Sequence, residues 1–333
     1  MALPAAKIGV ISIGDMGMGI AKLLIANGFS VATNCKGRSN DTIERAKSAQ
    51  VEVYKSDEHL AEACDVILSV VPPRDAAATA QRIVDAVTGP FRRSEPLFFA
   101  DLNAVAPSTT KTIAALFEQT RGQVRFIDGA IIGGPPKPAA AADASGSASS
   151  STGQPAAAGW SVPSIPMSGP YKISEIPGYG EKLSTALNAR HISDEIGAAS
   201  GLKMCFASLT KGFTSLAIQS FTTAKRLGVL DELQGELQGL VPAHWKAAER
   251  GVIGMAPKAY RWVKEMEEIA VTFDEEGGFP PDLFRGVAGV YRAVAEDTVL
   301  GEEKVGKRKR GTDVDDMAAA MAEGLENKRK KND

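Results

Sequence analysis

Two lysines in the second half of the 333-residue chain have the chemistry and the setting for proton transfer. Lys203 follows the segment GAASGL and lies near the start of a long predicted helix. A lysine buried beside a ligand loses solvation, so its pKa falls toward the working pH, where a general acid/base is most effective. Lys211 lies eight residues further on, about 80° around an ideal helix, and could share one helix side with Lys203 and Thr210. We rank Lys203 first and Lys211 second as catalytic candidates. The alternative for Lys203 is a solvated lysine on a helix face, whereas Lys211 could bind an anionic substrate group or serve as the proton donor itself.

A glycine-rich turn near the N-terminus predicts a dinucleotide site. The segment IGVISIGDMGMG, residues 8–19, places the turn between a strand pattern and a helix pattern. Gly14 would let the backbone approach a pyrophosphate, Gly17 would let the helix pack closely on the strand, and the helix start would add free N–H groups. Ser12 stands in place of the first glycine of the usual fingerprint and is small enough to keep the turn. The candidate cofactor residues here are Ser12, Ile13, Gly14, Asp15, Met16 and Gly17.

The end of the second predicted strand favours NADP(H) over NAD(H). An NAD site offers an acidic side chain to the ribose about 20 residues after the glycine turn. This chain has Asn34 there, followed by Lys36, Arg38 and Ser39. These side chains could pair with a 2′-phosphate, the arginine through its planar fork. The alternative is a loop of solvated polar residues.

Composition and charge exclude several function classes. The formal net charge is -2, so no overall field would recruit nucleic acid or an anionic membrane. The basic runs KRKR at 307–310 and KRKK at 328–331 are interpreted as solvated ends. The three cysteines and three histidines show neither disulfide nor metal-site spacing, so no metal is predicted. Without a signal peptide or a long apolar run, the protein is predicted to be soluble and cytoplasmic.

Hydrophobic periodicity predicts two domains. Short apolar runs alternate with amphipathic ones from Lys7 to about Ile132, which is typical of βαβ units and a parallel sheet in a Rossmann-type α/β fold. We expect this dinucleotide-binding domain to span residues 1–196, with a low-complexity insertion at 138–161. An all-helical domain is expected at 197–300, beginning with a helix from Ser200 to about Leu227, and a frayed charged tail at 301–333.

Several segments together resemble the β-hydroxyacid dehydrogenases, which include 3-hydroxyisobutyrate and 6-phosphogluconate dehydrogenases. The opening IGVISIGDMG is similar to that family's fingerprint, SVVPP at 69–73 to its loop after the fourth strand, and DLNA at 101–104 to its loop after the fifth. GAASGLK at 197–203 resembles its approach to the catalytic lysine, and TKG at 210–212 with RWVKEMEEIA at 261–270 resembles a little-studied branch whose C-terminal domain is 6-phosphogluconate dehydrogenase-like. The resemblance covers about residues 7–295.

The resemblance implies further site residues. Val71, Pro72 and Asn103 would line the nicotinamide half of the cofactor, and Asn103 would also position the substrate or the cofactor amide. Ile132, Gly133 and Gly134 would occupy the substrate loop, with Lys203 and Ala207 beside the substrate. Two positions depart from the family: Ile132 replaces a serine that holds the substrate carboxylate, and Ala207 replaces an asparagine one turn after the lysine.

The leading hypothesis is an NADP(H)-dependent oxidoreductase that transfers a hydride between nicotinamide and a small hydroxy acid or keto acid, with Lys203 as general acid/base. One alternative is an imine reductase on the same fold, which the apolar Ile132 would suit. Another is a non-catalytic NADPH-binding protein, because the usual substrate contacts are missing. The resemblance also implies a homodimer.

Overall fold

The computed structural model describes residues 6–89, 93, 95–139, 159–304 and 308–332. The chain divides into two compact units, Met1–Lys203 and Met204–Asp333. The hydrophobic pattern of the sequence predicts this boundary near residue 196. The difference arises because the first turns of the long helix make their contacts with the N-terminal unit, as Ser200 and Lys203 do below.

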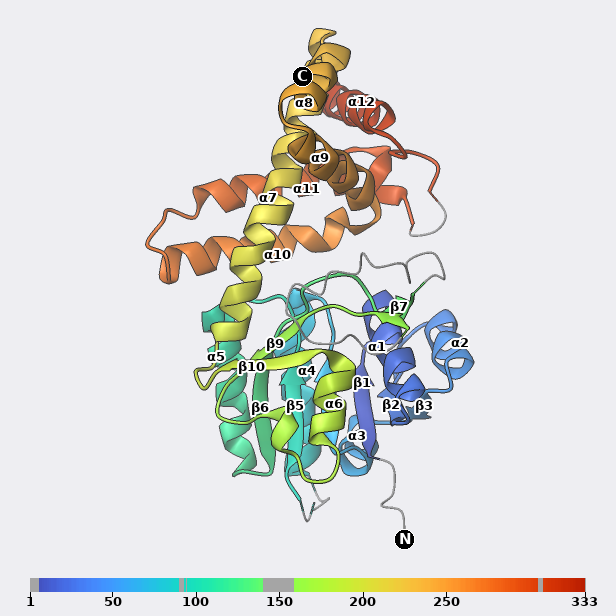
Figure 1. Ribbon diagram of the computed structural model, residues 1–333, viewed down its shortest axis with the longest axis vertical. Helices are drawn as coiled ribbons and strands as arrows, with labels where there is room; N and C mark the ends of the chain where they lie inside the picture. The colour runs from blue at the N-terminus through green and yellow to red at the C-terminus, as the bar shows by residue number, and fades with distance from the viewer. Residues whose placement is uncertain (1–5, 90–92, 94, 140–158, 305–307, 333) are drawn as a thin grey trace. The chain divides into compact units, whose positions relative to one another are not determined.

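An eight-stranded sheet forms the centre of the N-terminal unit, in the order β10-β9-β6-β5-β4-β1-β2-β3 (Figure 1). All neighbouring strands are parallel except β6 and β9. Residues such as Ile8, Val66 and Leu97 make the central strands mostly apolar, as is typical of a parallel sheet covered on both faces. The strands are β1 (Lys7–Ile11), β2 (Ser30–Asn34), β3 (Glu52–Tyr54), β4 (Val66–Ser69), β5 (Leu97–Asp101), β6 (Val124–Gly129), β9 (Ile165–Ser168) and β10 (Ala189–Ser193).

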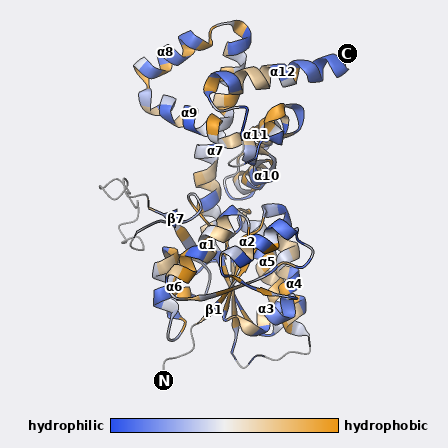
Figure 2. Cartoon of the chain, turned by 90° about the vertical axis from the view of Figure 1, so that its right-hand side faces the viewer, coloured by the Kyte–Doolittle hydropathy of each residue, from blue (hydrophilic) through white to orange (hydrophobic). Residues whose placement is uncertain are grey.

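Helices cover both faces of this sheet. One hydrophobic cluster joins the sheet to α1 (Asp15–Ala26), α2 (Asn40–Ser48) and α6 (Gly180–Leu187). A second cluster joins the opposite face to α3 (Asp57–Ala63), α4 (Ala76–Thr88) and α5 (Pro107–Leu116). In Figure 2 orange gathers at the centre of the sheet, while the helices around it carry both blue and orange. The predicted Rossmann-type fold is therefore confirmed. β10 and α6 were not predicted.

The predicted insertion at 138–161 is flanked by a short ribbon. β7 (Lys137–Pro138) pairs antiparallel with β8 (Trp160–Ser161). Residues 140–158 lie outside the described residues.

The C-terminal unit is helical, as predicted. Helix α7 (Ala198–Leu227) begins in the N-terminal unit and continues into this one. It is followed by α8 (Leu230–Leu240), α9 (Pro242–Met255), α10 (Ala259–Glu275), α11 (Asp282–Asp297) and α12 (Val314–Asn332). None of the described helices is long and apolar enough to cross a membrane.

The expected frayed tail differs from the structure. Helix α12 buries Met317, Ala318 and Met321, and it is joined to α7 by ion pairs from Lys225 to Asp315 and from Arg226 to Glu326. The apolar positions of α12 are few and mostly alanine, and many charged residues surround them, so the sequence pattern did not indicate a packed helix. The last turn, with Arg329, Lys330 and Lys331, is hydrophilic, as Figure 2 shows at the C-terminus.

Candidate functional site

The glycine-rich turn links β1 to α1 in the geometry that a pyrophosphate needs. Ser12 adopts φ 81, in the left-handed region that favours glycine, so it keeps the backbone path of the residue it replaces. A Cβ at Gly17 would overlap the carbonyl oxygen of Ser12, so only glycine permits this packing of helix on turn. No side chain caps α1 at Gly14, so the first N–H groups of the helix remain available to an anion.

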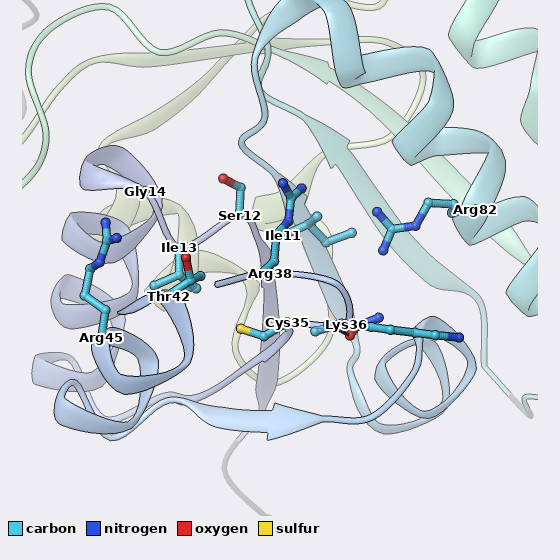
Figure 3. A pocket seen from close by; sticks show the side chains of 11 residues that line it. Ile11, Ser12, Ile13, Gly14, Cys35, Lys36, Arg38, Thr42, Arg45 and Arg82 are labelled. Atoms are coloured by element: carbon cyan, nitrogen blue, oxygen red, sulfur yellow. Dashed lines mark hydrogen bonds between the residues drawn. The ribbon is translucent and has the colours of Figure 1, made fainter. Parts of the chain in front are cut away.

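A pocket beside this turn gathers cationic side chains (Figure 3). It lies between the glycine turn and the turn after β2, and in the figure Arg82 extends from α4 toward Arg38. The residues that line it are Ile11, Ser12, Ile13, Gly14, Asn34, Cys35, Lys36, Arg38, Thr42, Arg45 and Arg82. No carboxylate among the described residues pairs with Lys36, Arg38 or Arg45. Unpaired cations around one concave site favour an anionic ligand.

One carboxylate behind the pocket organises part of its wall. Asp57 Oδ1 accepts a hydrogen bond from Asn34 Nδ2 at 2.7 Å. The same carboxylate receives Nε and Nη2 of Arg82 at 2.8 and 2.9 Å. Asn34 Oδ1 in turn accepts the backbone N–H of Lys36 at 2.8 Å. Asp57 therefore connects the β2–α2 turn to α4 before any ligand arrives.

The pocket agrees only in part with the residues expected from the sequence. Ser12, Ile13, Gly14, Asn34, Lys36 and Arg38 line it, whereas Ser39 does not: its Oγ caps α2 by accepting the N–H of Thr42. Thr42 and Arg45 were missed, although their helical spacing after Ser39 is a usable signal. No local sequence pattern predicts Arg82 as a pocket residue, because it reaches the pocket from α4, in a separate βα unit.

The loops after β4 and β5 are tied together by Asn103. Its Oδ1 accepts the N–H of Val71 at 2.7 Å, and its Nδ2 donates to Ser69 Oγ at 3.0 Å. The side chain is 3% exposed. Asn103 therefore holds the shape of the Val71–Pro72 loop. Its role in positioning the substrate or the cofactor amide stays a prediction.

Asp101 is a buried carboxyl group beside this loop. Its Oδ1 accepts the N–H of Asn103 at 3.0 Å, and its Oδ2 has no hydrogen-bond partner among the described residues. Burial raises the pKa of Asp101 to about 7, and Asp128, its register partner on β6, adds to the increase. The group is thus held largely neutral below neutral pH.

Changing Asp101 to asparagine is expected to alter how stability depends on pH. Between about pH 4 and pH 7 the folded chain retains a proton on Asp101 that the unfolded chain has released, so the unfolding free energy falls as pH rises. The total loss is at most about 4 kcal/mol, at about 1.4 kcal/mol per pKa unit. The variant lacks this loss and is expected to be more stable than wild type at pH 8. Urea unfolding at pH 5, 6.5 and 8 measures the unfolding free energy of both proteins. The same dependence of that free energy on pH in the variant and the wild type would contradict the prediction.

Lys203 lies on the first turns of α7, against the expected substrate loop. Its Nζ donates a hydrogen bond to the carbonyl oxygen of Ile131 at 2.8 Å, and the side chain is half-buried. Ile132 pairs with Ser164 through two backbone hydrogen bonds, and Gly133 has a positive φ of 132, which favours glycine. Gly134 is exposed. The structure thus brings Lys203 and this loop together within the N-terminal unit.

Lys211 and Ala207 lie in the C-terminal unit, and their roles at the site stay predictions. Lys211 Nζ forms an ion pair with the buried Glu265 and lies 4.8 Å from the ring centre of Trp262. Ala207 is 1% exposed. A buried ion pair with a cation–π contact accounts for Lys211 as part of the packing between α7 and α10. Among the described residues no cluster could hold a metal ion, and the three cysteines are free thiols.

Comparisons with known proteins identify the class of the molecule. Residues 7–152 match the NAD binding domain of 6-phosphogluconate dehydrogenase, and residues 224–294 match a domain of unknown function, DUF1932. The chain thus combines a segment that matches this NAD-binding domain with a segment that matches the DUF1932 domain. The match to a dehydrogenase domain supports classing the protein as an oxidoreductase. The resemblance stated from the sequence is therefore confirmed.

The relatives agree with this assignment. An uncharacterised 28.5 kDa protein in the 7S RNA 5′ region of Methanothermus fervidus is 25% identical over 227 residues, which cover 68% of this chain and 74% of that protein. A conserved protein of unknown function with structural similarity to 3-hydroxyacid dehydrogenases is 25% identical, with a TM-score of 0.57 over 86% of this chain and 97% of that one.

Two further solved structures share the fold. A 3-hydroxyisobutyrate dehydrogenase from Salmonella typhimurium has a TM-score of 0.61 and 17% identity over 94% of this chain and 98% of its own. A reductive aminase from Aspergillus terreus, in complex with NADPH and ethyl-5-oxohexanoate, has a TM-score of 0.50 and 16% identity over 95% of this chain and 98% of its own. The same architecture thus occurs in enzymes named for carbonyl and for amine chemistry.

Proposed function

We propose that the protein is an NADP(H)-dependent oxidoreductase. The observation that carries this proposal is the cationic pocket at the end of β2, where Asn34 stands in place of an acidic residue. Among the described residues, no carboxylate forms an ion pair with Lys36, Arg38 or Arg45. A carboxylate there would repel a 2′-phosphate, whereas these cations attract one. The residues also fit the rest of the cofactor, because the glycine turn leaves room and free N–H groups for a pyrophosphate.

Lys203 is proposed as the general acid/base. When bound, the nicotinamide cofactor supplies or accepts the hydride. The chain must then hold or move one proton at the substrate oxygen, and Lys203 Nζ lies at the Ile131 carbonyl, directly before the loop that would hold the substrate. The substrate class proposed is a small hydroxy acid or its keto acid. Substrate-loop residues Ile132, Gly133 and Gly134 and cofactor-loop residues Val71 and Pro72 remain part of this proposal.

A fluorescence titration with NADPH and with NADH tests the cofactor assignment. NADPH is expected to bind about 100-fold more tightly than NADH, since two charge-assisted contacts are each worth about 1.5 kcal/mol or more. Turnover with short 2- and 3-keto acids is then compared with turnover of cyclic imines. Faster turnover of imines would show that the substrate is an imine and not a hydroxy acid or keto acid, and it would not affect the cofactor assignment. Tight NADPH binding with no turnover of either class would favour a non-catalytic NADPH-binding protein.

A homodimer is also proposed, on the basis of an apolar stripe along α7. Phe206, Leu209, Phe213 and Leu216 alternate at spacings of three and four residues, the heptad spacing of helices that pack against one another. Leu209 is 79% exposed and Leu216 is 56% exposed. Such a repeat in an otherwise soluble chain indicates a surface that another helix covers, and a second copy of the same stripe is self-complementary.

Changing Leu209 and Leu216 together to glutamate is expected to convert the dimer to a monomer, because four like charges would be buried at a two-fold interface. Size-exclusion chromatography with light scattering measures the mass. Leu240→Glu is the matched control, since Leu240 is 77% exposed and lies on α8, away from the stripe. A wild-type monomer, or a double variant that remains dimeric, would rule out this interface.

A further inference from the structure

The Asp128 carboxylate, at the end of β6, accepts hydrogen bonds from several groups at the start of helix α7. Oδ1 accepts the hydroxyl of Ser200 at 2.6 Å. Oδ2 accepts the hydroxyl of Ser168 at 2.8 Å, the N–H of Gly197 at 2.9 Å and the N–H of Ser200 at 3.3 Å. Ser168 Oγ in turn accepts the N–H of Ala199 at 3.0 Å. Three of the N–H groups at the beginning of α7 are therefore satisfied by one side chain and its partner.

This arrangement is buried. Asp128, Ser168 and Ser200 are each no more than 1% exposed, and Thr110 of α5 adds a hydroxyl contact to Ser200 at 2.8 Å. A carboxylate at a helix N-terminus is further stabilised by the positive end of the helix dipole. Because charged hydrogen bonds in a buried network are strong and directional, the network permits one position of the helix start.

The backbone and the amine of Lys203 are both held by the short segment from Asp128 to Ile131. Asp128 holds the backbone from which Lys203 extends, and the carbonyl oxygen of Ile131, three residues later, accepts its Nζ. A shift of the helix start would therefore move Lys203 Nζ relative to the loop that follows β6. Shifts of about 1 Å at a reacting group can cost about 100-fold in rate.

We propose that Asp128 is a positioning residue for Lys203: by holding the start of α7 through Ser200, Ser168 and the helix N–H groups, it keeps the Lys203 amine against the substrate loop. The importance of this for catalysis rests on the proposed role of Lys203, but the positioning itself does not. Acetylation of lysines by acetic anhydride, read by peptide mass spectrometry, reports how firmly Lys203 Nζ is held, without cofactor or substrate.

Three variants form the experiment. Ser200→Ala removes the hydroxyl donor to Asp128 together with its contact to Thr110, and leaves the hydrogen bonds of Asp128 to Ser168 and to the backbone N–H groups. Asp128→Asn keeps one acceptor but turns an amide NH2 toward hydroxyl and N–H groups that all donate to Asp128 in the wild type. Thr120→Val is the matched control, since Thr120 is a buried hydroxyl of the same unit, bonded to the carbonyl oxygen of Phe117 and remote in sequence from α7. Lys22, exposed on α1, is the internal reference.

In wild type and Thr120→Val, Lys203 is expected to react several-fold more slowly than Lys22. In Ser200→Ala its rate is expected to rise about threefold or more toward that of Lys22, because local opening of the helix start frees the amine. Asp128→Asn is expected to show a larger rise; if it does not fold, Ser200→Ala alone decides. Equal Lys203 rates in Ser200→Ala and Thr120→Val would overturn the proposal, as would a wild-type Lys203 that reacts as fast as Lys22.

Once a substrate is known, the same variants provide a second readout. Ser200→Ala is expected to lower kcat about 3- to 10-fold with the KM for NADPH unchanged, as displacement of a reacting group predicts. Thr120→Val is expected to leave kcat unchanged. Absence of all oxidoreductase activity would refute the proposed function but leave the acetylation result standing, so the two failures are distinguishable.

Discussion

Replacement of Lys203 by methionine is expected to lower kcat by about 100- to 10 000-fold, the usual contribution of a positioned general acid/base. Methionine keeps most of the side-chain length but can neither hold nor donate a proton. The hydrogen bond from Nζ to the Ile131 carbonyl is lost at the same time. The dissociation constant of NADPH should remain within about twofold, because the cationic pocket lies at the other end of the cofactor site in this proposal. Steady-state kinetics and a binding titration measure the two quantities.

The control for this change is Lys225→Met. Lys225 lies on the same helix, is substantially exposed and pairs with Asp315 of α12. Exposed ion pairs contribute little, about 1 kcal/mol or less, so this variant should retain normal kcat. If Lys203→Met keeps the wild-type kcat, Lys203 is not the proton carrier. Lys211 would then be the next candidate, although its use in proton transfer would require breaking its buried ion pair with Glu265, which is energetically unfavourable.

Changing Lys36 and Arg38 together to alanine is expected to weaken NADPH binding by about 100-fold while NADH binding changes by less than about threefold. Each charge-assisted hydrogen bond to a phosphate contributes about 1.5–3 kcal/mol, and about 1.4 kcal/mol corresponds to a tenfold change in affinity. NADH lacks the 2′-phosphate, so it does not report these contacts. Titration of each variant with both cofactors at fixed ionic strength gives the selectivity ratio.

Lys22→Ala is the matched control for the pocket. It removes one exposed cation from α1, which begins at the glycine turn, but Lys22 does not line the pocket. It should change both affinities equally and only slightly, as a screened surface charge does. If the Lys36 and Arg38 double variant weakened NADH as much as NADPH, the pocket would serve the shared part of the two cofactors. The assignment of a 2′-phosphate site would then be withdrawn.

Much of the fold and part of the site could be predicted from short-range patterns. The β1–α1 turn was readable because Gly14 and Gly17 follow a strand pattern at fixed spacing, and Ser12 keeps a left-handed φ despite its side chain. Lys36 and Arg38 lie within a few residues of the end of β2, so their place in the pocket follows from the chain path. Ser39 caps α2 and does not line the pocket, which the sequence alone could not decide, because a serine before a helix can cap it as readily as bind phosphate.

What the sequence by itself determined about this protein is the succession of strands and helices, the glycine turn and the cationic turn after β2, because each depends on neighbours a few residues apart. Only the tertiary structure decided that Arg82 joins the pocket through Asp57, that Asp128 holds the start of α7, and that Lys211 belongs to Glu265. It also decided that α12 packs rather than frays. These outcomes depend on desolvation and charge pairing between residues 25 to 100 positions apart, which no local pattern encodes.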